Sequence, residues 1–110
     1  MITTRVLDLT HGHPAAGITV ILEVRHTSEW SPVGRGVTDE DGRLTSLTEG
    51  RQLAPGTYRL TFDTGAYHRD HGITVPFFPE AKITFNVRDT SANHHVPLLL
   101  SPYGYTTYRD

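Results

Sequence analysis

Three segments of the chain alternate between apolar and polar residues. In residues 18–24 an apolar side chain occupies every second position, and residues 57–62 and 82–87 repeat this pattern. Because successive side chains of a β-strand point to opposite faces of a sheet, the alternation predicts three strands. Each strand would turn one face toward a core and the other toward solvent.

Shorter strands and turns fill most of the remaining chain. Further strands are expected at residues 3–9, 34–38 and 43–46. Glycine, proline and aspartate mark turns between the strands, at residues 12–14, 39–42, 54–56 and 76–79. The one helix candidate is short, at residues 64–71. Many short strands separated by turns predict an all-β fold, a two-sheet antiparallel sandwich with one short helix.

The last segment, residues 93–110, predicts a β-hairpin. An apolar run at 96–100 is followed by a Ser101-Pro102 turn and then by alternating Tyr and Thr. His95 precedes the apolar run, and Arg109 lies near the end of the segment 93–110. An ionisable group on an apolar strand costs free energy unless it is paired or used, so both residues are candidates for a functional site.

Composition limits the classes of function. With 110 residues the chain predicts a single domain, 1–110, large enough for one modest core. It carries 10 basic and 12 acidic residues without a basic block, so we expect no nucleic acid partner. No apolar run approaches the roughly 18 residues of a membrane span, and no leader segment is evident, so we expect a cytoplasmic protein without a membrane partner. The absence of Cys excludes disulfides and thiolate chemistry.

Several motifs occur in a family's order and spacing. They are Val6-Leu7-Asp8 with Gly12-x-Pro14-Ala15, Thr38-Asp39-x-Asp41-Gly42-Arg43, Gly56-Thr57-Tyr58 with Phe62-Asp63-Thr64-Gly65, Phe77-Phe78-Pro79-Glu80, and the C-terminal HVPLLLSP…Y…TYR. Together they resemble the 5-hydroxyisourate hydrolases, enzymes of urate degradation in purine metabolism that share the transthyretin fold. The resemblance implies a transthyretin-like (prealbumin-like) sandwich. It also implies a homotetramer, a dimer of dimers with substrate channels at the dimer–dimer interface.

The resemblance also implies a set of site residues. In the family a His on the first strand, an Arg after the central turn, the His before Val-Pro and the C-terminal Tyr-Arg-Gly-Ser form the site. Here Arg43, His95, Tyr108 and Arg109 match it. Opening a cyclic amide needs a base for the water proton and a cation for the oxyanion, roles that suit imidazole and guanidinium. We therefore expect a small-molecule substrate and no cofactor, with His95, Arg43 and Tyr108 as catalytic residues.

The chain departs from the family at the positions that should carry chemistry. Arg5 occupies the place of the first-strand His, and Asp110 follows Arg109 in place of Gly-Ser. Asn93 and His94 stand where the family commonly has His and Tyr. An arginine cannot accept a proton at ordinary pH, so one expected imidazole is missing.

Two hypotheses for Arg5 stay open. In the first, the hydrolase persists: Arg5 keeps His95 neutral, Arg109 is an auxiliary cation and Asp110 replaces the lost Ser. In the second, the Arg-rich channel serves a repurposed relative, a binding protein or an enzyme of another pathway, whose ligand is a different anionic small molecule. Hydrolysis is the primary hypothesis.

The seven histidines raise two further questions. His13 follows the first strand and is a candidate to replace the missing imidazole in substrate binding. A metal site is not expected, because the chain lacks Cys and has no His-Glu motif in which Glu could act as a base. His68 and His71 also lie among charged residues, in a segment expected to be solvated.

Overall fold

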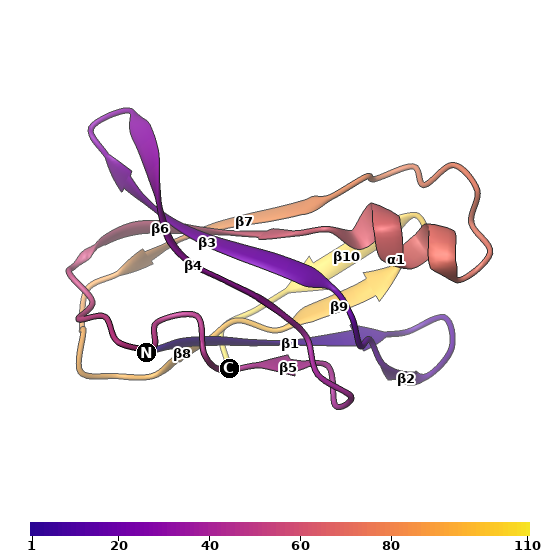
Figure 1. The fold of residues 1–110 in the computed structure, drawn as a ribbon, viewed down its shortest axis with the longest axis horizontal. Helices are drawn as coiled ribbons and strands as arrows, with labels where there is room; N and C mark the ends of the chain where they lie inside the picture. The colour runs from indigo at the N-terminus through magenta and orange to yellow at the C-terminus, as the bar shows by residue number, and fades with distance from the viewer.

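The computed structural model describes residues 1–110 as two packed β-sheets with one short helix. The elements are β1 Ile2–Asp8, β2 His13–Pro14, β3 Thr19–His26, β4 Glu29–Val37, β5 Arg43–Leu44, β6 Gly56–Phe62, α1 Thr64–Asp70, β7 Ala81–Val87, β8 His94–His95, β9 Leu98–Ser101 and β10 Gly104–Thr107. Figure 1 shows α1 at the end of the sandwich, beyond β6. No helix is long and apolar enough to pass through a lipid bilayer.

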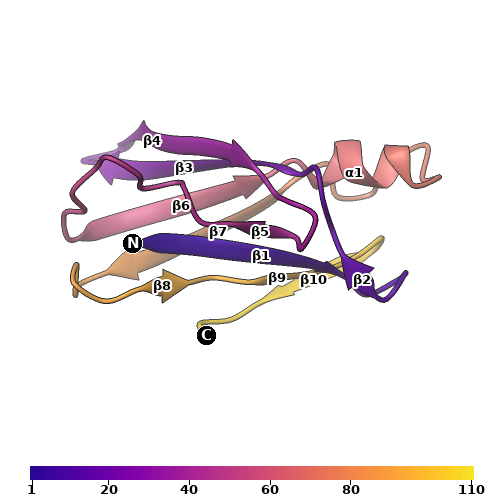
Figure 2. The ribbon, with the colours of Figure 1, turned by 60° about the horizontal axis from the view of Figure 1, so that its bottom comes forward.

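The two sheets form separate layers (Figure 2). One runs in the order β4-β3-β6-β7. The other runs β10-β9-β1-β2, and β5 and β8 also pair with β1. Eighteen buried apolar residues from both sheets and their connections form one core. The fold class predicted from the alternation and the motifs is confirmed.

The predicted elements agree with the structure in most places. The helix predicted at residues 64–71 is α1, which begins after Asp63, whose side chain accepts a hydrogen bond from the backbone N–H of Ala66 at 3.2 Å. The last hairpin also forms, although its turn is Pro102-Tyr103, since Ser101 still pairs with Gly104. The strand predicted at 34–38 is longer and begins at Glu29.

One feature differs from an antiparallel sandwich. β8 and β9 pair with β1 in parallel, whereas the other pairings are antiparallel. The chain leaves the other sheet at the end of β7 and crosses over through residues 88–93 before it reaches β1. A crossover of this kind lets a strand enter in the same direction as its neighbour.

A buried carboxylate joins β1 to α1. Asp8 is 4% exposed, and its Oδ2 accepts a hydrogen bond from the Tyr67 hydroxyl at 2.7 Å across 59 residues of chain. Burial by itself would raise the pKa of Asp8. The hydrogen bonds from Tyr67 and His11 outweigh that effect and lower the pKa from 3.8 to about 2.

Tyr67→Phe removes this hydroxyl and should lower the free energy of unfolding at pH 7 by about 1–3 kcal/mol. Because the folded pKa of Asp8 lies below its unfolded value, the stabilisation is present above pH 3.8 and is lost as the pH falls toward 2. The difference between variant and wild type should therefore shrink over that range. Urea unfolding at several pH values measures it, with exposed Tyr103→Phe as the control.

Candidate functional site

β1 presents polar side chains to the outer face of its sheet. Ile2, Thr4 and Val6 are 0% exposed and point into the sandwich. The residues between them must therefore point the other way, which places Thr3 and Arg5 together on the outer face. Any residue paired directly opposite Thr3 or Arg5 shares this face, because opposite residues of neighbouring strands point to the same side.

His95 lies directly beside Thr3. The two residues are register partners in the parallel pairing of β8 with β1, and Thr3 Oγ1 lies 2.8 Å from His95 Nδ1. This hydrogen bond fixes the orientation of a half-buried imidazole and directs its Nε2 away from Thr3. His94 points to the opposite face, where it is buried and its Nε2 lies 2.8 Å from the Asp89 carbonyl. His95 is therefore the histidine that β8 offers to the outer face.

Arg43 lies directly opposite Arg5. They are register partners in the antiparallel pairing of β5 with β1. Arg5 is further held by its Nε–H, which donates to the Asp41 carbonyl at 3.1 Å. Neither guanidinium takes part in any of the three ion pairs of the structure, which are His11–Asp8, Arg59–Glu23 and Lys82–Glu80. Two adjacent cations without a carboxylate partner suit an anion or the polarised oxygens of a planar ring.

The turn before β5 sets the position of Arg43. Asp39 Oδ1 accepts the backbone N–H groups of Asp41 and Arg43, each at 2.9 Å. Gly42 has φ +74°, and its carbonyl accepts the Val6 N–H at 2.8 Å. A Cβ at Gly42 would lie 2.3 Å from the Val6 carbonyl oxygen, so only glycine allows the turn to approach β1 this closely.

The C-terminal tail reaches the site through its backbone. The Asp110 N–H donates to the His95 carbonyl at 3.1 Å, which brings the exposed Asp110 alongside β8. Tyr108 and Arg109 lie elsewhere, in a cavity of about 420 Å³ that is also lined by β7 and by His94. Within this one chain the structure brings Arg5, Arg43 and His95 together and does not bring Tyr108 or Arg109 to the same face.

His13 does not join this group either. It pairs with Asp8 at the far end of β1, and its ring stacks near His11 with centroids 5.6 Å apart. Thr3, by contrast, was not singled out from the sequence although it contacts His95. Its place two residues before Arg5 puts it on the Arg5 face, but its partner lies 92 residues away in the chain, and no local pattern predicts that pairing.

Comparison with known proteins covers nearly the whole chain. A model of the HIUase/Transthyretin family matches residues 2–110. The 5-hydroxyisourate hydrolase of Salmonella dublin is 41% identical over 109 residues, which are 99% of this chain and 79% of that protein. The 5-hydroxyisourate hydrolase of Mus musculus is 39% identical over 110 residues, 98% of this chain and 92% of that protein.

Solved structures agree with this grouping. Transthyretin from Sparus aurata matches with a TM-score of 0.92 and 31% identity, covering 99% of this chain and 95% of the other. The 5-hydroxyisourate hydrolase of Klebsiella pneumoniae matches with a TM-score of 0.86 and 32% identity, covering 99% and 96%. The resemblance inferred from the sequence motifs is confirmed.

Gly42→Ala tests how the turn places Arg43. The free energy of unfolding should fall by about 3 kcal/mol, because the added Cβ meets backbone atoms and the positive φ is strained as well. Gly50→Ala is a matched control: Gly50 has φ +73° with nothing within 4 Å of its added Cβ, so it carries the strain without the clash. Denaturant unfolding compares the two, and equal losses would contradict the packing argument.

Proposed function

This chain belongs to the HIUase/transthyretin family, and on that premise we propose that it is a 5-hydroxyisourate hydrolase. Relatives that carry this name are 36–41% identical over nearly its whole length. The observation that carries the proposal is the joint placement of Arg5, Arg43 and His95 on the outer face of one sheet. A base and two cations on one face are the groups that opening a cyclic amide requires.

His95 acts as the general base in the proposed reaction. Thr3 holds the ring by Nδ1, so Nε2 is the nitrogen directed to a water molecule. The water oxygen attacks a ring carbonyl carbon while Nε2 takes one of its protons. When the tetrahedral intermediate collapses and the ring C–N bond breaks, the same proton passes to the leaving nitrogen. His95 thus returns to its starting state, and the sum of the steps is the addition of one water molecule.

Arg43 and Arg5 supply the positive charge. The carbonyl oxygen becomes negative as water adds, and a guanidinium placed beforehand stabilises it without reorganisation. Arg43 is exposed and has no carboxylate partner, so it is the proposed clamp for this oxyanion. Arg5 is restrained by the Asp41 carbonyl and is the proposed contact to a second substrate oxygen. In this arrangement Arg5 contributes a positive charge at the position where the family pattern has the imidazole of the first-strand His.

The tail completes the proposed site. Asp110, hydrogen bonded through its backbone to His95, offers an acceptor near the imidazole. Tyr108 and Arg109 line the cavity beside β7 within one chain, so they are left out of the mechanism on this face. His13 lies too far along β1 to take part and is left out of the mechanism.

We further propose that the site is closed by a second subunit. The Arg5, Arg43 and His95 face is an open sheet surface in one chain, and a homotetramer built as a dimer of dimers would cover it with a second sheet. Excluding water strengthens the electrostatic interactions on which the mechanism relies. The proposed compartment is the cytoplasm.

The direct test is the decay of freshly generated 5-hydroxyisourate. Wild-type protein should remove it faster than the spontaneous reaction in buffer, and His95→Asn should reduce kcat by roughly a hundredfold or more, because the general base is lost. His26→Asn, at the exposed end of β3 on the other sheet, is the matched control and should keep full activity. A wild-type rate no greater than that of buffer would sink the proposal and favour a binding protein for anions.

Arg5→His separates the two roles open to Arg5. If its cation binds substrate, the variant should show a KM raised by about tenfold with a smaller change in kcat, equivalent to about 1.4 kcal/mol of binding. Arg35→His, an exposed arginine of β4, is the control and should leave the kinetics unchanged. A variant faster than the wild type would show instead that Arg5 merely replaces a better imidazole.

A further inference from the structure

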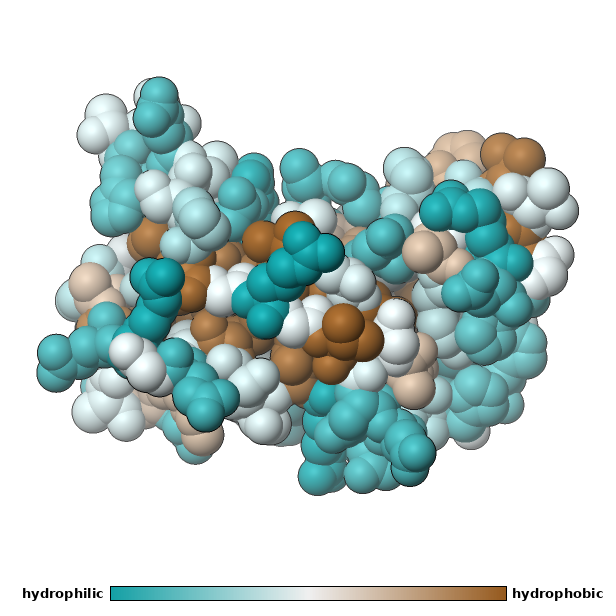
Figure 3. Space-filling view, in the orientation of Figure 1, coloured by the Kyte–Doolittle hydropathy of each residue, from teal (hydrophilic) through white to brown (hydrophobic).

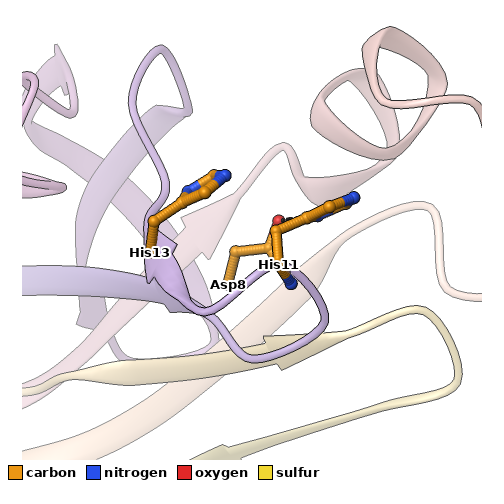
Figure 4. Close-up of side chains that lie close together, drawn as sticks. All are labelled: Asp8, His11 and His13. Atoms are coloured by element: carbon orange, nitrogen blue, oxygen red, sulfur yellow. Dashed lines mark hydrogen bonds and ion pairs between the residues drawn. The ribbon is translucent and has the colours of Figure 1, made fainter.

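A second cluster of ionisable side chains lies at the end of β1 opposite the N-terminus. Asp8 ends β1, His11 lies in the following turn, His13 opens β2, and His71 follows α1. Figure 4 shows the rings of His11 and His13 directed to the same side of the turn, next to Asp8. None of these residues takes part in the proposed hydrolysis, and the cluster lies at the other end of β1 from His95.

His11 lies near two other imidazoles at nearly the spacing of ligands of one ion. The centroids of His11 and His13 are 5.6 Å apart, and those of His11 and His71 are 5.8 Å apart. Possible ligand atoms of Asp8, His11 and His13 all lie within 4.8 Å of one another. With metal–nitrogen bonds of about 2 Å in a tetrahedron, two bound imidazoles have centroids about 5 Å apart. Small movements of exposed side chains would therefore close the site.

The hydrogen bonds of all three rings leave the same nitrogen free. Nδ1 of His11 lies 2.7 Å from Asp8 Oδ2, Nδ1 of His13 lies 2.8 Å from the Pro14 carbonyl, and Nδ1 of His71 lies 2.8 Å from the Tyr67 carbonyl. A carboxylate and a carbonyl accept, so each Nδ1 donates a proton to its partner and Nε2 is the nitrogen left to bind a metal ion. Metal-binding histidines characteristically have their second nitrogen tied to a carboxylate or a carbonyl in this way.

Asp8 is suited to orient His11 because it is itself immobile. Its Oδ1 accepts the backbone N–H groups of Thr10 and His11, at 2.9 and 3.1 Å, and Oδ2 also accepts the Tyr67 hydroxyl. The carboxylate is buried, which further restricts its movement. A carboxylate next to the three rings favours a cation there.

We propose that His11, His13 and His71 bind one divalent transition-metal ion through Nε2, with Asp8 as the carboxylate that positions His11. Zn²⁺ fits this nitrogen set, which leaves a fourth position for water. The ion would link the turn after β1 to the end of α1. No metal was predicted from the sequence, because the chain lacks Cys and a His-Glu motif. His71 is distant in the chain from the other two histidines, and their proximity arises only from folding.

The experiment is a calorimetric titration of the metal-free full chain with Zn²⁺ at neutral pH. Wild type should bind one ion per chain at this site. His11→Gln, His13→Gln and His71→Gln should each weaken binding by about tenfold or more. His26→Gln is the matched control, an exposed histidine on β3 outside the cluster, and should keep wild-type affinity. A cooperative unfolding transition in denaturant, measured without metal, confirms that each variant is folded.

Three results would overturn the proposed metal site. The wild type could fail to bind Zn²⁺ stoichiometrically, any of the three variants could keep wild-type affinity, or His26→Gln could lose as much affinity as they do. Loss of binding in His95→Asn would place the ion on the other face and would also overturn the proposal. A second readout is the midpoint of thermal unfolding. Zn²⁺ should raise it in the wild type and leave it unchanged in His13→Gln, because an ion stabilises a protein only when it binds the folded state.

Discussion

The structure depends on the alternation of β1 between the two faces of its sheet. The side chains of Ile2, Thr4 and Val6 are buried in the core, and those of Thr3 and Arg5 point to the outer face. The strand also forms antiparallel pairs with β2 and β5 and parallel pairs with β8 and β9. A slip of one residue would move a guanidinium into the core and apolar side chains to the surface, so the core fixes which residues the proposed site receives.

The proposed site sets like charges side by side. Arg5 and Arg43 are direct register partners, and like charges placed opposite one another in a sheet are unfavourable. The turn keeps its shape through hydrogen bonds of the backbone and of the Asp39 side chain, and Arg5 adds one to the Asp41 carbonyl. Two adjacent guanidinium groups without a carboxylate partner suit an anionic or polarised ligand.

The two ends of β1 carry different chemistry. Near its beginning, Thr3 orients His95 on the outer face, and at its end Asp8 orients His11 on the side of α1. In both places a polar side chain of β1 forms a hydrogen bond with an imidazole from a short strand or a turn. The loop between α1 and β7 exposes Val75 and Phe77 and belongs to neither site. Figure 3 shows apolar atoms at its upper right, at the end of the molecule where this loop lies.

The sequence by itself determined the longest alternating strands with their inward faces, the short helix and the family, but not the start of β4 or the short strand β2 at the predicted turn 12–14. The features that it determined follow from local periodicity, from turn residues such as Gly42, and from motifs that contain Arg43 and His95. Only the tertiary structure decided that His95 lies beside Thr3, that β8 runs parallel to β1, and that the tail turns Tyr108 toward β7. The reason is physical: alternation records the side on which a residue lies, whereas the choice of a partner far along the chain is made by the packing of the whole core.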